Sequence, residues 1–162
     1  MKPPQQKIVT SLWFDSNAED AIKFYLSIFN NSRILSLQRY SKAAPGPEGS
    51  VMTIAFELEG QTFLAINGGP AFKFTEAISL SVNCDSQSEI DELWDKLSAD
   101  GGEKGHCGWL KDKYGLSWQI VPTRLGELMQ SDDAEKTQRV MTALLKMSKL
   151  DIDALEQVYK HP

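Results

Sequence analysis

Three side chains, Glu57, His106 and Cys107, have the chemistry of acids, bases or nucleophiles. An imidazolium beside a thiol lowers the pKa of the thiol and favours the reactive thiolate, so the adjacent His106 and Cys107 are one candidate pair. Neighbouring residues of a strand point to opposite faces of a sheet, however, and residues 106–111 are predicted to be extended. We therefore set aside the His106–Cys107 pair as a reactive thiolate site and keep Glu57 and His106 as candidate acid and base.

A group of acidic residues, Asp15, Glu19 and Asp20, lies where a helix is expected to begin. Carboxylates at this place cap free N–H groups and interact favourably with the positive end of the helix macrodipole. We predict capping rather than acid–base chemistry. The glycine-rich segments 67–70 and 101–102 could surround an anion, but their spacing matches no phosphate loop, and turns are needed at both places.

Uncharged polar side chains offer another chemistry, the hydrogen bonding of a small molecule. In residues 77–83 the apolar Ile78, Leu80 and Val82 alternate with alanine, serine and asparagine. Because successive side chains of a strand point to opposite faces, one face should be polar and open. Residues 51–58 and 116–121 alternate in the same way. Simple solvation of such a face, as in many antiparallel sheets, is the alternative.

The elements that must position these residues follow from hydrophobic periodicity. Apolar stripes at helical spacing begin at Ile22 and at Ile90, an offset of 68 residues, and continue through Tyr25, Leu26 and Phe29 and through Leu93, Trp94 and Leu97. Strands are predicted over 8–14, 33–40, 51–59, 61–67, 77–83, 106–111 and 116–121. The chain therefore repeats a strand–helix–strands unit and belongs to the α+β class.

The pattern changes after residue 122. Residues 123–162 are helical in pattern, with a possible cap at 131–133 and an apolar series of Val140, Met141, Leu144, Leu145 and Met147. We predict two parts, a paired domain over residues 1–122 and a C-terminal helical extension over residues 123–162.

Composition excludes several classes of function. The net charge of -5 and the pI near 5.1 argue against binding to nucleic acid, which needs clustered Lys and Arg. No run approaches the ~20 apolar residues that cross a bilayer, so no membrane role is expected. With two cysteines and an N-terminal MKPPQQK unlike a signal peptide, the sequence predicts a cytoplasmic protein.

Three runs resemble the vicinal-oxygen-chelate superfamily: TSLWFDSNAEDAIKFYLSIF, FTEAISLSVNCDSQSEIDELWDKLSADGG and CGWLKDKYGLSWQIVP. The nearest branch is the PhnB-like, glyoxalase/bleomycin-resistance-related group, whose members often carry the label 3-demethylubiquinone-9 3-methyltransferase. The resemblance covers about residues 7–122. It implies paired βαβββ modules that form a curved mixed sheet around a cleft, and often a homodimer.

The resemblance also implies where a metal would bind, because metal-dependent members carry His, Gln or Glu at four positions. These fall on Thr10, on residues 64–66, on Ala77 and on Gln119. Divalent transition metals need imidazole, thiolate or carboxylate donors, which these positions lack. We predict neither a metal site nor a cofactor. A strand followed by a glycine-rich helix start with a later acidic partner, which would favour a nucleotide cofactor, is not found in the sequence.

Three functions remain open. The first is a protein that binds or sequesters a small molecule in a polar cleft, with ligand contacts at Thr10, Thr53, Ser79, Trp109 and Gln119. The second is an enzyme, either a lyase, isomerase or dioxygenase of the superfamily or the methyltransferase of the label. The third is an interaction protein whose apolar extension residues face a partner, which burial of that stripe would contradict.

Overall fold

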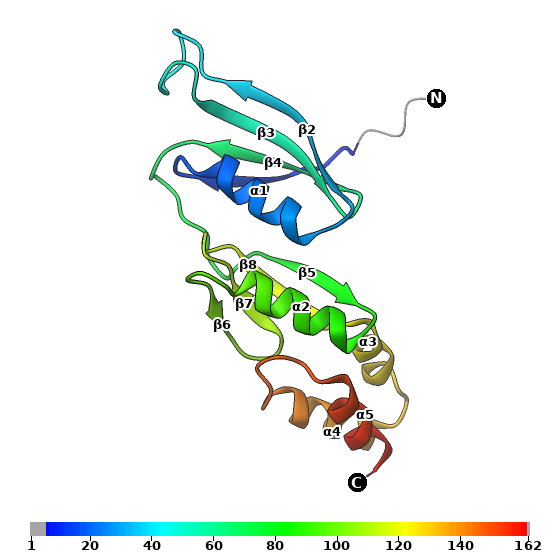
Figure 1. Ribbon diagram of the computed structural model, residues 1–162. Helices are drawn as coiled ribbons and strands as arrows, with labels where there is room; N and C mark the ends of the chain where they lie inside the picture. Colours follow the sequence, from blue (N-terminus) through cyan, green and yellow to red (C-terminus); the bar gives the residue numbers. More distant parts are fainter. Residues whose placement is uncertain (1–5, 162) are drawn as a thin grey trace, which may run out of the picture. The chain divides into compact units, whose positions relative to one another are not determined.

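The computed structural model describes residues 6–161, and the chain divides after Lys73 into two compact units (Figure 1). Residues 1–5 and residue 162 lie outside this range. They include most of the N-terminal MKPPQQK, on which the signal-peptide prediction depends, the start of the predicted 1–122 domain and the end of the predicted 123–162 extension. Between residues 6 and 161, no helix has the length and apolar character needed to cross a membrane.

The first unit is a four-stranded mixed sheet with one helix. Its elements are β1 (Thr10–Phe14), α1 (Ala18–Ile28), β2 (Ser32–Arg39), β3 (Val51–Leu58) and β4 (Gln61–Asn67). The strand order is β1-β4-β3-β2, with β1 parallel to β4 and the other pairs antiparallel. The predicted βαβββ order is confirmed.

Helix α1 covers one face of this sheet (Figure 1). Ile22 and Tyr25 of α1 are fully buried, as are Ile54 and Phe56 of β3. Burial of such side chains contributes roughly 1.5–3 kcal/mol each, which explains the alternation of buried and partly exposed residues from Thr53 to Leu58. The intervening residues, Thr53 among them, point to the other face.

The second unit repeats this topology. Its sheet contains β5 (Ser79–Cys84), β6 (Glu103–Lys104), β7 (Trp109–Lys111) and β8 (Ser117–Pro122) in the order β5-β8-β7-β6, and α2 (Gln87–Leu97) follows β5. The parallel pair is β5 with β8. The 68-residue repeat is thus a structural repeat, and the sequence missed only the short β6.

The strand predicted over residues 106–111 begins later, at Trp109. Cys107 and Gly108 have φ angles of 56° and 81°, in the left-handed region, so residues 105–108 form a loop. The alternation used to separate His106 from Cys107 is therefore wrong for these two residues, because it holds only in a strand.

A buried carboxylate fixes the turn before β8. Asp112, 2% exposed, accepts hydrogen bonds from the backbone N–H groups of Tyr114 (2.8 Å) and Leu116 (3.1 Å) through Oδ1. Its Oδ2 accepts one from Trp118 Nε1 at 2.9 Å. Gly115 has a φ of 88°, as the turn requires. The turn is structural, as the sequence predicted.

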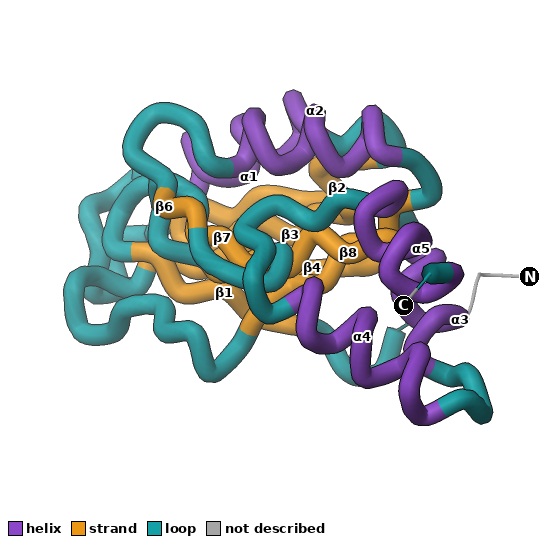
Figure 2. Tube along the Cα trace, turned by 90° about the horizontal axis from the view of Figure 1, so that it is seen from below, coloured by secondary structure: helices purple, strands orange, loops and turns teal. Residues whose placement is uncertain are grey.

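The C-terminal extension consists of α3 (Thr123–Met129), α4 (Ala134–Leu144) and α5 (Ile152–Lys160), and it belongs to the same compact unit as the second sheet. Figure 2 shows α4 beside α5. Leu128, Val140 and Leu155 form a separate buried cluster, against which Leu144 and Met147 pack. Most of the apolar stripe is therefore covered within the chain, whereas Met141 and Leu145 remain 39% and 63% exposed.

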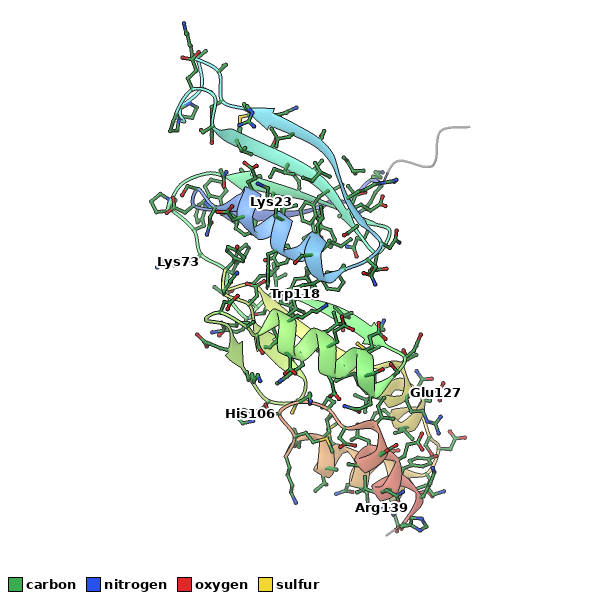
Figure 3. All side chains as sticks on the ribbon, viewed as in Figure 1. Lys23, Lys73, His106, Trp118, Glu127 and Arg139 are labelled. Carbon is green, nitrogen blue, oxygen red and sulfur yellow. The ribbon has the colours of Figure 1, made fainter. Side chains whose placement is uncertain are left out.

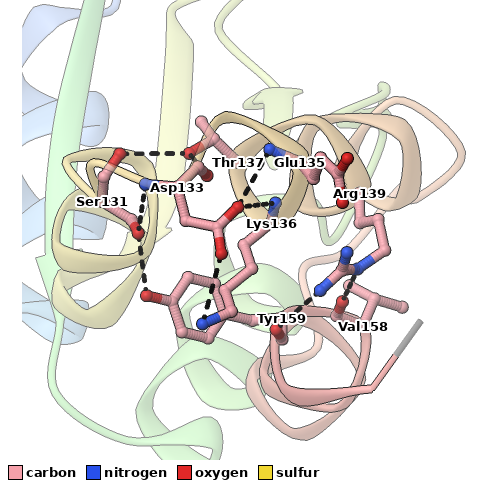
Figure 4. Close-up of polar contacts among 8 residues, drawn as sticks. All are labelled: Ser131, Asp133, Glu135, Lys136, Thr137, Arg139, Val158 and Tyr159. Carbon is pink, nitrogen blue, oxygen red and sulfur yellow. Dashed lines mark hydrogen bonds and ion pairs between the residues drawn. The ribbon is translucent and has the colours of Figure 1, made fainter.

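Polar contacts join α4 and the residues before it to the C-terminal end of α5 (Figure 4). Asp133 caps α4 by accepting from the N–H groups of residues 135 and 136, which confirms the predicted cap. Tyr159 Oη donates to Ser131 Oγ at 3.0 Å, and Arg139 donates to the carbonyl oxygens of Val158 and Tyr159. The guanidinium thus satisfies carbonyl groups at the C-terminal end of α5.

Candidate functional site

Three of the five predicted ligand contacts, Ser79, Trp109 and Gln119, share one face of the second sheet. Trp109 lies opposite Gln119 in the β7–β8 register, and Gln119 Nε2 donates to Ser79 Oγ at 2.9 Å. Leu80 and Trp118 point to the other face, which α2 covers. The polar face predicted from alternation is therefore present in this unit.

Ser117 lies on the same polar face, between Ser79 and Lys111 in the register of the sheet. It is 1% exposed, and its Oγ has no hydrogen-bond partner within residues 6–161. A buried hydroxyl without a partner costs roughly 1–3 kcal/mol, which a polar group of a ligand would offset. The sequence placed Ser117 on the polar face by alternation, but its burial could not be predicted.

The charge on this face is compensated. Lys111 Nζ lies 2.5 Å from Glu76 Oε1 and 3.5 Å from Glu103 Oε2. The hydrogen bond with Glu76 raises the pKa of Lys111 and lowers that of Glu76. Because two carboxylates already neutralise the ammonium group, the face suits a neutral hydrogen-bonding molecule better than an anion.

The other two predicted contacts belong to the first unit. Thr10 lies on the same face of β1 as Leu12 and Phe14, which are buried under α1. Thr53 lies on the opposite, uncovered face of its sheet, where its Oγ1 donates to Gln38 Oε1 at 3.3 Å. Of the two threonines, only Thr53 is on an open face.

A cavity of about 550 Å³ lies in the first unit, at the ends of β1 and β4, and its lining includes Asp15, Glu19 and Tyr40. Asn67 lies in the lining and is hydrogen-bonded to three of the segments around the cavity. The side-chain amide accepts from Ala18 N–H at 2.9 Å and donates to the carbonyl oxygen of Val51 in β3, and the backbone carbonyl oxygen of Asn67 accepts from Tyr40 Oη. Asn67 thus caps α1, since Asn17 makes no side-chain cap, whereas Glu19 and Asp20 of the predicted acidic group lie in the first turn of the helix.

The remaining candidates for acid–base chemistry belong to different units. Glu57 lies 3.4 Å from the guanidinium of Arg33 in the first unit. His106 is exposed in the 105–108 loop of the second unit, and Figure 3 shows its side chain on the outside of the ribbon. The Cys107 thiol donates to the Leu144 carbonyl oxygen at 3.5 Å. Each of these side chains therefore has a structural role or faces solvent.

The residues at the metal positions of the superfamily do not fit a divalent transition metal. Thr10 lies on the covered side of its sheet, Ala77 has no donor, and Gln119 is hydrogen-bonded to Ser79. In the part of the chain that is described, no three His, Cys, Asp or Glu side chains lie close enough together to hold a metal ion.

Comparison with solved structures places the fold among known proteins. The PhnB protein from Bacillus cereus is 41% identical, with a TM-score of 0.67; the match covers 73% of this chain and 100% of that one. The fosfomycin resistance protein FosX from Listeria monocytogenes is 15% identical, with a TM-score of 0.57, over 80% of this chain and 100% of its own. A protein from Pseudomonas aeruginosa is 20% identical, with a TM-score of 0.60, over 73% of this chain and 98% of its own. The last two similarities show the fold alone.

Sequence comparison gives the family. No protein of curated function matches this chain closely enough to count as a relative. The family model described as 3-demethylubiquinone-9 3-methyltransferase matches residues 6–121, which cover both βαβββ units. The chain therefore belongs to this family, in its PhnB-like branch, and shares the fold of the vicinal-oxygen-chelate superfamily.

Proposed function

We propose that this protein binds a small, neutral, polar molecule on the polar face of β5, β8 and β7, opposite the face that α2 covers. The observation that carries the proposal is the buried Ser117 hydroxyl, which has no partner in the described chain and lies among polar side chains. Polar groups that converge beside an aromatic ring are typical of ligand sites. The proposal uses Ser79, Trp109 and Gln119 of the five predicted contacts.

The chemistry of this face indicates the class of ligand. Ser117 can donate or accept a hydrogen bond, and Ser79, which accepts from Gln119, still has a proton to donate. Trp109 is half-buried and offers a flat apolar surface. We propose a molecule with hydroxyl or amide groups on one side and a flat apolar part on the other.

We also propose that binding involves no metal and that the protein acts in the cytoplasm as a homodimer. The superfamily metal positions lack imidazole, thiolate and carboxylate donors, which supports binding without a metal. Two free cysteines support a cytoplasmic location. Mass spectrometry of native, untagged protein tests the metal. About one tightly bound transition metal per chain would overturn the metal-free proposal. Light scattering on the protein as it elutes from a size-exclusion column tests the homodimer.

Methyl transfer, which the family description names, would need a site for a methyl donor. In doubly wound folds a nucleotide cofactor binds at a glycine-rich turn from strand to helix. Here the corresponding turns, residues 15–17 and 85–86, contain no glycine. The structure thus gives methyl transfer no specific support, and S-adenosylmethionine is included in the binding experiment as a separate arm.

Ligand-observed NMR with a library of small neutral polar aromatics tests the proposal. Ser117→Ala should lower the affinity for the ligands found in the screen about 5- to 30-fold, which corresponds to one hydrogen bond of ~1–2 kcal/mol. The same variant should not lower stability, because it removes a buried hydroxyl that has no partner. Ser27→Ala, which changes an exposed serine of α1, is the matched control. Hits unaffected by both Ser117→Ala and Trp109→Ala would contradict the proposed site.

A further inference from the structure

The segment that joins α4 to α5 lies against the loop that precedes Trp109. Cys107 N–H donates to the Met147 carbonyl oxygen, and Gly108 N–H donates to that of Ser148, both at 2.8 Å. Ser148 Oγ donates to the Gly105 carbonyl oxygen at 2.5 Å. The loop 105–108 thus donates two hydrogen bonds to, and accepts one from, residues about 40 positions later in the chain.

The same connecting segment is fixed on its other side to α2. Gln87 uses both ends of its amide: Nε2 donates to the Leu150 carbonyl oxygen at 3.1 Å, and Oε1 accepts from Ile152 N–H at 2.9 Å. Lys149 Nζ lies 2.6 Å from Asp91 Oδ1. The connecting segment is therefore anchored to the helix that covers the second sheet.

Gly108 lies between the connecting segment and β8. A Cβ at this position would lie 2.8 Å from the Ile120 carbonyl oxygen and 3.1 Å from the side chain of Leu150, so the connecting segment packs directly on the loop. Ile120 N–H donates to the Gly108 carbonyl oxygen at 2.8 Å, and Trp109 follows at once. The loop is held between the segment and β8, next to Gln119.

We infer that residues 147–152 are a brace that positions Trp109 opposite Gln119, with Ser148 and Gln87 as positioning residues. The family model ends at residue 121, so the brace is an addition of this chain to the matched region. The positioning of Trp109 follows from the contacts alone. Its consequence for ligand binding rests on the proposed function.

The experiment uses full-length protein labelled with 5-fluorotryptophan, whose four fluorine resonances report the four tryptophans. Ser148→Ala should shift or broaden the Trp109 resonance, assigned with Trp109→Phe, more than the other three. Amide hydrogen exchange at Cys107 and Gly108 should become about fivefold faster, since one hydrogen bond of the brace is lost. Thr142→Ala, an exposed threonine of α4, should leave both signals unchanged.

Faster exchange with an unchanged Trp109 resonance would overturn the inference, since the segment would then hold only the loop. Unchanged exchange would overturn it as well. Because neither signal needs a ligand, the result is independent of the proposed function. If hits from the binding screen weaken in Trp109→Phe but not in Ser148→Ala, the site stands and the brace does not contribute to it. Weakening in both variants supports the two proposals together.

Discussion

Replacement of Asp112 by Asn tests the network that holds β8 and its polar face. The carboxylate is buried and accepts three hydrogen bonds, two from backbone N–H groups and one from the indole of Trp118, which is itself 2% exposed. An amide of the same shape has one acceptor and one donor end. Whichever way it turns, an NH₂ group must face a buried N–H donor.

The expected cost follows from these contacts. A hydrogen bond to a charged group contributes about 1.5–3 kcal/mol, and a buried donor left without a partner costs about 1–3 kcal/mol. If the amide oxygen keeps the two backbone donors, Trp118 Nε1 loses its acceptor. We therefore expect Asp112→Asn to lower the free energy of unfolding by about 2–4 kcal/mol.

Urea unfolding followed by circular dichroism measures this change, and a double-mutant cycle with Trp118→Phe isolates the indole bond. In the Trp118→Phe background, Asp112→Asn should cost at least about 1 kcal/mol less, because the donor is already gone. Asp132→Asn, at an exposed aspartate, is the control and should be nearly neutral. A loss under about 0.5 kcal/mol, or no coupling between the two sites, would refute the reasoning.

Three further predictions concern the second unit. Gly108→Ala should cost about 2–5 kcal/mol, because strain at positive φ adds to a backbone clash, whereas Gly115→Ala, at positive φ in open space, should cost about 1–2 kcal/mol. Urea unfolding compares them, and equal costs would contradict the packing on Gly108. The hydrogen bond with Lys149 lowers the pKa of Asp91, so this pair contributes stability above the usual Asp pKa of about 3.9 and loses it as pH falls below that value. Lys149→Met should raise that pKa toward its usual range in a carboxyl NMR titration; an unchanged pKa would exclude the ion pair. Burial raises the pKa of Cys84 to about 12, so iodoacetamide at pH 8 should leave Cys84 of the native protein unlabelled. Stability should decline above about pH 8.5, since the unfolded thiol loses its proton first; rapid native labelling would contradict this.

The sequence predicted the repeated units well because each sheet has one covered face. Alternation along β3 from Thr53 to Leu58 identifies the covered side, and the stripes that begin at Ile22 and Ile90 identify the covering helices. Ile78, which alternation placed on the covered face of the second sheet, precedes β5 and is 68% exposed. The same logic placed Ser79, Trp109 and Gln119 on one polar face. Local periodicity suffices where a single pattern is enforced by burial along a whole element.

Other features depend on residues far apart in the chain and could not be predicted from local pattern. The start of α1 is capped by Asn67, 49 positions after the N–H group that it accepts from. Cys107 and Gly108 of the 105–108 loop donate hydrogen bonds to the carbonyl oxygens of residues 147 and 148. The burial of the Ser117 hydroxyl is likewise a tertiary property, since alternation gives the face of a residue but not its exposure.

A difference between the two units explains why the second one has a brace. In the first unit, β2 pairs with β3 from Ser32 to Arg39, so the sheet itself satisfies the backbone there. In the second unit, β6 pairs with β7 only at Glu103 and Lys104, and the chain between them and Trp109 would be left without a partner strand. Buried backbone N–H groups need acceptors, and the connecting segment supplies them to Cys107 and Gly108. The extension thus takes the place of the missing strand pairing beside the proposed ligand face.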